Sequence, residues 1–466
     1  MKFITIAVTA IWIVLMAYGQ SKPLPQGLSL EGSVHSVPEV EFLADFTYQR
    51  AGVVVREQAI FNRMCRIVDE AKRFVLLDLF LFNSVHGQGG KFPALAEDLT
   101  GRLVKKKEQS PKVDIVLITD AINRSYGPEE PEHFKKLRAS GVRIIYTDTD
   151  RLRDSNIFYS AWWRIFCQWF GTQGEGWIPS PFAENGPDMT LRAYLSLLNF
   201  KANHRKVAAN EKEALITSAN PHDASAYHSN IGFVVQGNVL QDIVDSEGAV
   251  ANLSREALPK WALPVSRKSG DLQVRLLTEG KIKSRLLQEL SRCSSGCSVR
   301  MAMFYLSDRD IIEGLLGATD RGGEVRLLLD PNKDAFGRSK NGIPNRPVAS
   351  ELVARSEGVI QVRWYETHGE QFHSKLTIIS QPEHTVLIGG SANLTRRNID
   401  DLNLETCLEV SGPAEAKVMR EATGYFERIW RNRDGNYSID FKEFFEDSPL
   451  RYWLYRFQEW SGMSTF

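Results

Sequence analysis

The chain has 466 residues, enough for two or three average domains, and 43% of them are hydrophobic, which supports sizeable cores and excludes extensive disorder. Its 57 basic residues balance its 57 acidic residues, so the formal net charge is zero. This balance excludes the broad basic surface of a sequence-independent nucleic-acid binder, and we do not expect nucleic acid as a partner.

Residues 1–20 form a segment apart from the rest of the chain. Lys2 precedes an uncharged, largely apolar run from Phe3 to Gly19. This pattern predicts a signal peptide or an N-terminal membrane anchor, because Ala17-Tyr18-Gly19 has the form of a cleavage site and the run is near the lower length limit for spanning a bilayer. Positive charge lies only before the run, so we expect a membrane-associated protein whose body lies outside the cytoplasm, on the periplasmic side of the inner membrane in a bacterium.

Residues 40–240 alternate between strand and helix patterns. Apolar runs predict strands over 74–82, 113–119 and 142–147, and helical patterns lie near 57–72 and 94–107. The segment 148–203 interrupts this alternation with an insertion rich in aromatic residues. Its aromatic residues are Trp162, Trp163, Phe166, Trp169, Phe170, Trp177 and Phe182. Such a cluster fits either a rim that contacts acyl chains at a membrane surface or, given its partly helical spacing, packing on the core.

Residues 270–435 repeat the alternation, with strands predicted over 298–306, 324–329 and 360–365 and helices near 281–292 and 308–318. Alternating strands and helices imply a sheet flanked by helices in each half, and therefore an α/β protein made of two similar halves. Residues 436–466 form a C-terminal extension that mixes aromatic residues with arginines. It admits the same two interpretations as the insertion.

The five cysteines contribute little to the prediction. An odd number leaves at least one free thiol, and Cys293 and Cys297 are close enough in sequence to pair in an oxidising compartment. The Cys and His residues lack a convincing zinc spacing, so we expect no structural metal, and nothing in the sequence indicates a cofactor.

The most informative feature is a repeated constellation of polar residues. The repeat consists of His204, Lys206 and Asn220 in the first copy and His373, Lys375 and Asn393 in the second. In both copies the Asn ends a run of small residues, and another Asn follows ten residues later. Chance produces a single His-x-Lys often, but not this duplicate.

His-x-Lys on an extended segment projects both side chains to the same face. An imidazole near neutral pH attacks phosphorus or transfers a proton, and the ammonium attracts the nonbridging oxygens of a phosphate. The small-residue turn and its Asn add backbone and amide donors. These groups together suit the opening of a phosphodiester without a metal.

The two copies are useful only together, since one imidazole must attack while the other protonates the leaving oxygen. We therefore expect the active site at a pseudo-twofold interface between the halves.

These motifs resemble those of the phospholipase D superfamily, whose members carry two copies of His-x-Lys, four residues and Asp, followed by Gly-Ser-x-Asn. The resemblance covers about residues 40–435. Two positions depart from it, because Glu211 and Ser380 stand where the family has Asp. The second copy also has the longer spacing between its His and its Asn, which predicts a longer hairpin around residues 381–385.

The resemblance implies residue roles. His204 would be the nucleophile that forms a phosphohistidine, and His373 the general acid that then activates water or an acceptor alcohol. The two Lys and the two Asn residues would hold the phosphoryl oxygens. Glu405, at the family's downstream acidic position, would orient a catalytic His, whereas the equivalent position in the first copy is Gly232, which would leave His204 without such a partner.

Several polar residues near the motifs have alternative roles. Asp120 and Asp330 follow predicted strands, where an acid either binds a metal or headgroup or shapes a turn. Arg396, Arg397 and His222 lie just beyond the Asn turns and would either reach a substrate phosphate or serve the structure.

The resemblance implies a phospholipase D-like phosphodiesterase or phosphatidyltransferase that acts on membrane phospholipid, of a cardiolipin-synthase-like kind. Water or an alcohol would be the acceptor. The apolar N-terminal run and the aromatic insertion favour phosphatidyl transfer at a membrane. Two alternatives remain, an endonuclease of the same superfamily and a non-catalytic lipid-binding protein.

Overall fold

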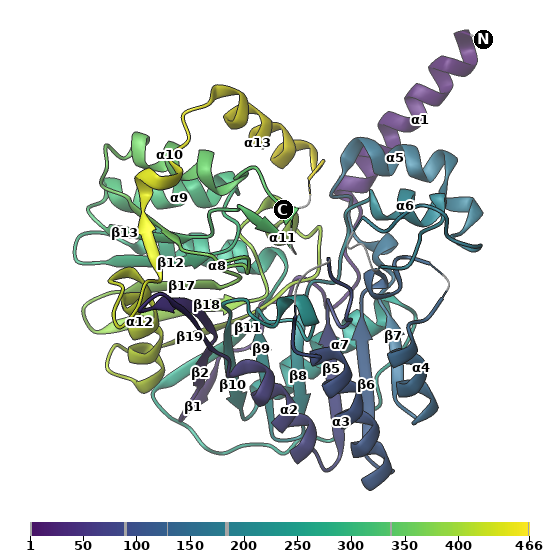
Figure 1. Ribbon diagram of the computed structural model, residues 1–466, viewed down its shortest axis with the longest axis horizontal. Helices are drawn as coiled ribbons and strands as arrows, with labels where there is room; N and C mark the ends of the chain where they lie inside the picture. The colour runs from purple at the N-terminus through teal and green to yellow at the C-terminus, as the bar shows by residue number, and fades with distance from the viewer. Residues whose placement is uncertain (1, 88–90, 128, 182–185, 336–337, 465) are drawn as a thin grey trace.

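The computed structural model describes residues 2–87, 91–127, 129–181, 186–335, 338–464 and 466. Phe182 of the aromatic insertion lies outside them. Two large mixed sheets, each flanked by helices, form the body of the molecule (Figure 1), which confirms the predicted α/β fold with two similar halves. The first sheet has the order β2 (Glu41–Ala44), β10 (Ile231–Gln236), β9 (Glu213–Thr217), β8 (Lys206–Asn210), β5 (Phe74–Leu79), β6 (Asp114–Thr119), β7 (Arg143–Tyr146).

The second sheet repeats this order and adds a strand at each edge. Its order is β1 (His35–Val37), β11 (Leu272–Thr278), β19 (Thr406–Pro413), β18 (His384–Gly390), β17 (Lys375–Ser380), β12 (Ser298–Met303), β13 (Glu324–Leu329), β16 (Gln361–Tyr365), β20 (Ser438–Asp440). In each half three neighbouring strands are parallel, and the His-x-Lys strand runs antiparallel to the first of them. The register is the same, since Lys206 pairs with Leu79 in one half and Lys375 with Met303 in the other.

Alternate residues of the central strands enter different cores. In β5, Phe74 and Leu76 belong to a core shared by the two halves, whereas Val75, Leu77 and Leu79 face the outer helices. Both faces of the strand are therefore buried, which explains its continuous apolar sequence. The shared core contains side chains from both sheets and from two helices, α7 (Val239–Leu253) and α12 (Lys417–Trp430).

The outer faces of the sheets are covered by amphipathic helices. These are α2 (Ile60–Glu70), α3 (Leu95–Gln109) and α4 (Glu132–Ala139) in the first half, and α8 (Gly280–Arg292), α9 (Arg309–Asp320) and α10 (Asn345–Arg355) in the second. Two of them begin at carboxylates. The Asp45 carboxylate accepts hydrogen bonds from the backbone N–H groups of Ala59 and Ile60, and Asp308 caps α9 through the N–H of Ile311.

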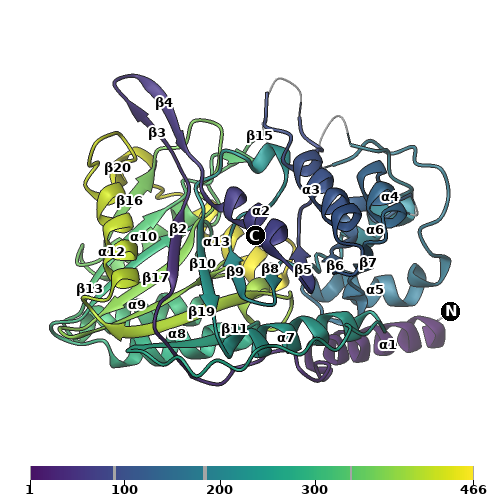
Figure 2. The same ribbon diagram turned by 90° about the horizontal axis from the view of Figure 1, so that it is seen from below.

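Smaller elements complete the chain. The hairpin of β3 (Phe46–Arg50) and β4 (Val53–Glu57) extends from the first half towards β20, where Gln49 forms a β-bridge with Asn436 (Figure 2). A second short hairpin pairs β14 (Asp334–Ala335) with β15 (Arg338–Ser339). The insertion contains α5 (Ile157–Phe166) and α6 (Leu191–Leu197), and α13 (Pro449–Ser461) lies near the C-terminus. Cys293 and Cys297 form a disulfide, and the other three cysteines are free and buried.

The N-terminal segment forms α1 (Lys2–Ser21), which lies against α5 and extends away from the body (Figure 1). Its last turn is tied to the insertion, because the Gly19 carbonyl accepts a hydrogen bond of 3.0 Å from the N–H of Asp154. Gly19 is required there, since a Cβ would lie 1.9 Å from an Asp154 carboxylate oxygen. Within the described residues, no helix combines the length and apolar character needed to cross a membrane.

Candidate active site

The two His-x-Lys motifs lie at equivalent places in the two sheets. Each His immediately precedes its strand, and a buried Asp that follows the second of the three parallel strands, β6 or β13, fixes the backbone there. The N–H of Asn203 donates to Asp120 at 2.8 Å, and that of Phe372 donates to Asp330, also at 2.8 Å. Burial raises the pKa of each Asp to about 6. Asp120 and Asp330 therefore have the structural role in positioning the loop before each His.

An aromatic ring lies beside His and Lys in the first half-site. The ring of Phe80 lies edge-on to His204, with 4.8 Å between centroids, and the Lys206 ammonium is 5.1 Å from the same ring. Lys206 Nζ also donates a hydrogen bond of 2.6 Å to the His204 carbonyl. The ring and the carbonyl hold the Lys beside the imidazole.

The second half-site repeats this arrangement with the ring of Phe304. Its centroid is 5.1 Å from that of His373, the Lys375 ammonium is 5.0 Å from it, and Lys375 Nζ donates to the His373 carbonyl at 2.8 Å. The two copies therefore match in three independent contacts. Neither Phe was singled out from the sequence, although each follows a central strand at the same position.

The carboxylate partner of His204 comes from the other half of the chain. His204 Nδ1 lies 2.7 Å from Glu405 Oε1, and Glu405 also accepts hydrogen bonds from the Ser391 hydroxyl and the Asn398 amide. The expectation that Gly232 leaves His204 without an acidic partner is therefore wrong, because the partners cross between the halves. His373 is the histidine that lacks a carboxylate.

His373 meets Asn230 instead, with 3.1 Å between Nδ1 and Oδ1. The asymmetry begins in the backbone. The segment before His204 forms a parallel bridge through Asn203 and Leu404, but the segment before His373 bridges Phe372 with Ser229, which is two residues earlier than the equivalent of Leu404. The offset brings Asn230 beside His373, so that an amide replaces the carboxylate.

His228, which no sequence pattern singles out, lies beside the second half-site. Its ring centroid is 5.7 Å from that of His373, and its Nδ1 accepts a hydrogen bond of 3.2 Å from the N–H of Gln371. Burial lowers its pKa to about 3, so it remains neutral. Its neutral ring is a polar group held in a fixed position beside His373.

Burial controls the protonation of the site. It lowers the pKa of His204 to about 4 despite the neighbouring Glu405, and it lowers the pKa of His373 well below the ordinary value with help from the positive charge of Lys375. Burial lowers the pKa of Lys206 to about 7, and burial together with the charge of Lys206 places that of Lys375 well below its usual range. Burial alone would raise the pKa of Glu405, but His204 and Lys206 outweigh it and the pKa is lowered. A neutral imidazole thus lies beside an ionised carboxylate, near two buried lysines whose charged form is disfavoured by burial.

The two turn Asn residues have different surroundings. Asn220 Oδ1 accepts a hydrogen bond of 3.4 Å from the N–H of Leu81. Asn393 is buried, and its Oδ1 has no partner among the described residues. The structure therefore leaves one amide oxygen of the second copy for a hydrogen bond from a ligand or water.

The two positions that depart from the family pattern are structural. Glu211 turns back to accept hydrogen bonds of 3.0–3.2 Å from the N–H groups of Lys72 and Arg73, where β5 begins. Ser380 accepts from the Thr385 hydroxyl at 3.2 Å, at the end of the β17–β18 hairpin. This hairpin is longer than β8–β9, as predicted, and most of the added residues extend its strands.

The other polar residues near the turns serve the structure. His222 Nε2 lies 2.7 Å from the Val85 carbonyl, in the loop next to Asn220. Arg396 donates to Gln20 Oε1 at 2.7 Å, and Arg397 donates to the Ser464 carbonyl at 3.1 Å. The two arginines therefore connect the loop of the second Asn to α1 and to the C-terminal segment.

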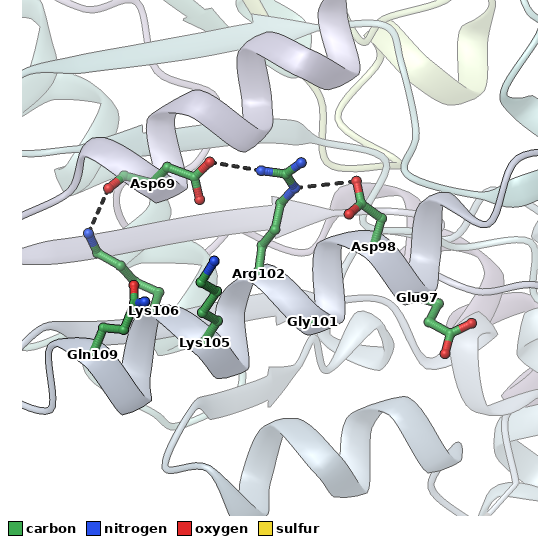
Figure 3. Close-up of a pocket in the computed structure, with 8 residues that line it drawn as sticks. All are labelled: Asp69, Glu97, Asp98, Gly101, Arg102, Lys105, Lys106 and Gln109. Carbon is green, nitrogen blue, oxygen red and sulfur yellow. Dashed lines mark hydrogen bonds and ion pairs between the residues drawn. The ribbon is translucent and has the colours of Figure 1, made fainter.

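A solvent-filled hollow of about 550 Å³ lies between α2 and α3, where Arg102 bridges Asp69 and Asp98 (Figure 3). None of the seven predicted site residues lines it. Among the described residues, no group of three or more His, Cys, Asp and Glu side chains is arranged to hold a metal ion. The site of chemical interest is therefore the pair of half-sites between the sheets.

Comparisons with known proteins agree with this architecture. Residues 286–430 match a family model described as cardiolipin synthase, PLD-like domain. None of the curated proteins compared with the sequence matches it. The structure resembles the phosphatidylserine synthase of Haemophilus influenzae Rd KW20 with a TM-score of 0.58 and 10% identity, over 98% of each chain.

Two other solved structures share less with this chain. They are the polyphosphate kinase of Porphyromonas gingivalis (TM-score 0.46, 12% identity, 91% of this chain and 54% of that chain) and Nuc, a phospholipase D family member of Salmonella typhimurium (TM-score 0.27, 19% identity, 36% of this chain and 97% of that chain). The sheets and their paired half-sites define a two-domain phospholipase D-like protein. Residues 286–430 are similar to the cardiolipin synthase, PLD-like domain, and the chain shares its fold with the phosphatidylserine synthase.

Proposed function

We propose that the protein is a phosphatidyltransferase or phospholipase D-type phosphodiesterase that acts on membrane phospholipid through a covalent phosphohistidine. The observation that carries this proposal is the contact of 2.7 Å between His204 Nδ1 and Glu405 Oε1. An imidazole that donates from Nδ1 to an ionised carboxylate keeps its lone pair on Nε2, which is the form that attacks phosphorus.

The first step forms a bond between His204 Nε2 and phosphorus and breaks the bond from phosphorus to the leaving alcohol oxygen. His373 donates a proton to that oxygen. Its low pKa results from burial and from Lys375, and a bound phosphate anion would oppose the effect of the Lys charge. In the second step water or an acceptor alcohol gives its proton to His373 and attacks phosphorus, and the bond to His204 breaks.

The two lysines bind the nonbridging oxygens in this mechanism. Both are buried with no carboxylate of the described residues in hydrogen-bond contact, and each is held by a backbone carbonyl and an aromatic ring. A diester anion would restore their full charge. The Asn220 and Asn393 amides lie in the adjoining turns, and we assign them to the same oxygens.

Support for a phospholipid substrate comes from the family description and from the phosphatidylserine synthase that shares the fold. The apolar α1 supports the proposal that the enzyme works at a membrane, with its body outside the cytoplasm. Both half-sites keep their His, Lys and Asn, which supports catalysis over lipid binding alone.

The test is mass spectrometry of products after incubation of the full chain with phosphatidylglycerol liposomes, with and without added glycerol. Cardiolipin and glycerol as products would identify a phosphatidyltransferase, and phosphatidic acid a hydrolase. His204→Ala should abolish both, while the exposed His384→Ala on the β17–β18 hairpin should keep them. Cleavage of DNA instead of lipid would replace the proposal with an endonuclease.

A further inference from the structure

Three helices far apart in the sequence expose large apolar side chains. These helices are α1, α5 with the short turn η3 (Gln168–Phe170), and α13. Trp169 is 73% exposed and Trp453 is 66% exposed. The other exposed apolar residues are Phe3, Ile6, Val8, Ile11, Ile13, Val14 and Tyr18 on α1, Trp162, Phe166 and Phe170 on α5–η3, and Leu450, Leu454, Phe457 and Trp460 on α13. We call these side chains together the aromatic face.

The three helices form one continuous surface. Trp12 of α1 donates from its indole to the Phe158 carbonyl of α5 at 3.1 Å, and their rings lie 6.2 Å apart. Phe158 in turn lies 5.6 Å from Trp460 of α13. Figure 1 shows the three helices along one edge of the molecule. The aromatic face is therefore much larger than a scatter of single apolar residues.

Packing in the core does not account for these side chains. In α13 only Tyr455, Glu459 and Ser461 are buried. A hollow of about 490 Å³ lies between α13 and the ends of α8, α9 and α11 (Arg396–Ile399), and Trp453 and Trp460 line it. The two Trp rings are thus directed to solvent and to this hollow, so the interpretation of the C-terminal aromatics as core residues applies to Tyr455 alone.

The exposed charges of the three helices themselves have one sign, and three acids that line the neighbouring hollow, Asp308, Asp310 and Asp400, pair with Lys283. Residues 2–21 and 157–170 contain no acidic residue, and the single acid of α13, Glu459, is buried. The basic residues are Lys2, Arg164, Arg451 and Arg456. Arg164 pairs with Asp154 and Arg451 with Glu446, whereas Lys2 and Arg456 form no ion pair among the described residues. In a chain with no net charge, a surface that combines exposed tryptophans with uncompensated cations is complementary to anionic lipid.

We propose that the aromatic face docks on an anionic phospholipid bilayer and presents the active site to it. The proposal rests on the proposed function and adds the surface through which the substrate is reached. The face adjoins the loop of the second half-site, because Glu459 of α13 accepts a hydrogen bond of 2.7 Å from the N–H of Arg396, three residues after Asn393. Aromatic rings enter the headgroup region, and the helices lie along the interface.

The first experiment measures contact with lipid at one position, so that insertion of α1 alone does not give the signal. An environment-sensitive fluorophore is attached to Trp453→Cys in the His204→Ala background, and to the exposed Val359→Cys as the control. Vesicles of phosphatidylcholine with phosphatidylglycerol should shift the emission at position 453 to the blue, phosphatidylcholine alone should do so less, and position 359 should not respond. No shift at 453, or equal shifts at both positions, would overturn the proposal.

The second experiment separates docking from chemistry. Trp169→Asp with Trp453→Asp should lower turnover of phosphatidylglycerol in vesicles about tenfold or more and leave hydrolysis of the water-soluble bis(4-nitrophenyl) phosphate unchanged. Equal loss on both substrates would show a folding defect, and unchanged turnover on vesicles would overturn the docking surface. If the wild type cleaves neither diester while the fluorophore still responds, the proposed function fails and the docking surface stands.

Discussion

Glu405 lies in the second half of the chain and holds a catalytic candidate of the first half, His204. It receives hydrogen bonds from His204, Ser391 and Asn398, so its carboxylate has one orientation. Glu405→Gln keeps the shape but removes the charge and permits the wrong imidazole tautomer. We expect turnover to fall about 100-fold or more, as it does when a carboxylate that orients a catalytic His is neutralised in other enzymes.

Asn230→Asp is the matched variant of this experiment, because it places a carboxylate beside the other histidine. It should raise the pKa of His373 and move the pH optimum, while Glu405→Gln should lower the rate at every pH. Equal activity of Glu405→Gln and wild type would contradict the assignment of His204 as the nucleophile.

Lys206 should make anion binding depend on pH. Burial lowers its pKa to about 7, so it is charged below pH 7 and neutral above it. A bound diester anion favours the charged form, and above pH 7 binding therefore takes up a proton. The affinity for diethyl phosphate, which does not titrate in this range, should fall roughly tenfold per pH unit above pH 7. Competition assays between pH 6 and 9 measure this slope, and Lys206→Met should abolish it.

At the scale of single residues, the sequence predicted the candidate site residues but not which residue each histidine contacts. The repeated motif predicted six His, Lys and Asn residues, and the structure places the His and Lys of each copy side by side in two half-sites, while their catalytic roles stay predictions. The partner of each histidine depended on a crossing between halves and on an offset of two residues at Ser229, neither of which has a local pattern. For the same reason His228 was missed, since its contact to His373 joins residues far apart in the chain.

Among the elements, β18 shows how closely its end approaches the neighbouring strand β19 of the same sheet. A Cβ on Gly390 would lie 2.3 Å from the Thr406 carbonyl oxygen and 2.8 Å from the Cys407 Cα. Backbone atoms cannot move aside as a flexible side chain can. Gly390→Ala should therefore destabilise the protein by about 1–3 kcal/mol in urea denaturation. Gly424→Ala in α12, where nothing lies within 4 Å of an added Cβ, is the control and should stabilise or change little.

The segment that leads into β8 directs neighbouring side chains to opposite sides. Arg205 points away from the site, is fully buried, and pairs with Glu279 at 2.7 Å and Glu247 at 3.1 Å. Arg205→Met leaves two buried carboxylates without their cation, so we expect a loss of about 3–5 kcal/mol of unfolding free energy. Thermal unfolding of Arg205→Met, Glu247→Gln and the double variant would check it, and additive losses would contradict a coupled network.

The predicted elements of the parallel layers match the structure within a few residues, because strands buried on both faces and amphipathic helices have strong local patterns. The edge and return strands were not predicted. Strands such as β2 and β11 lie far in sequence from their neighbours β10 and β19, so their pairing depends on long-range contacts. The aromatic insertion had two interpretations because helical spacing is the same for a side chain facing the core and one facing a membrane.

At the scale of the molecule, the halves are joined by an irregular segment between α7 and β11. Residues 267–270 of this segment lie at the surface or partly exposed, away from the paired half-sites. Fragments 1–268 and 269–466, expressed separately, should be inactive because His204 and Glu405 are then on different chains. Expression of both fragments in one cell should restore turnover in proportion to the complex recovered by size-exclusion chromatography. Activity of either fragment alone would show that one half-site suffices.

His204 and Glu405 come into contact only when the two halves of the chain have associated. A chain that has completed only its first 240 residues, or whose halves have not yet associated, holds no histidine in the tautomer needed for attack. Reactivity thus arises in the final step of assembly, after both cores have formed. In the proposed mechanism, a nascent or partly degraded molecule would therefore be chemically inert towards a bilayer, because its two half-sites have not joined.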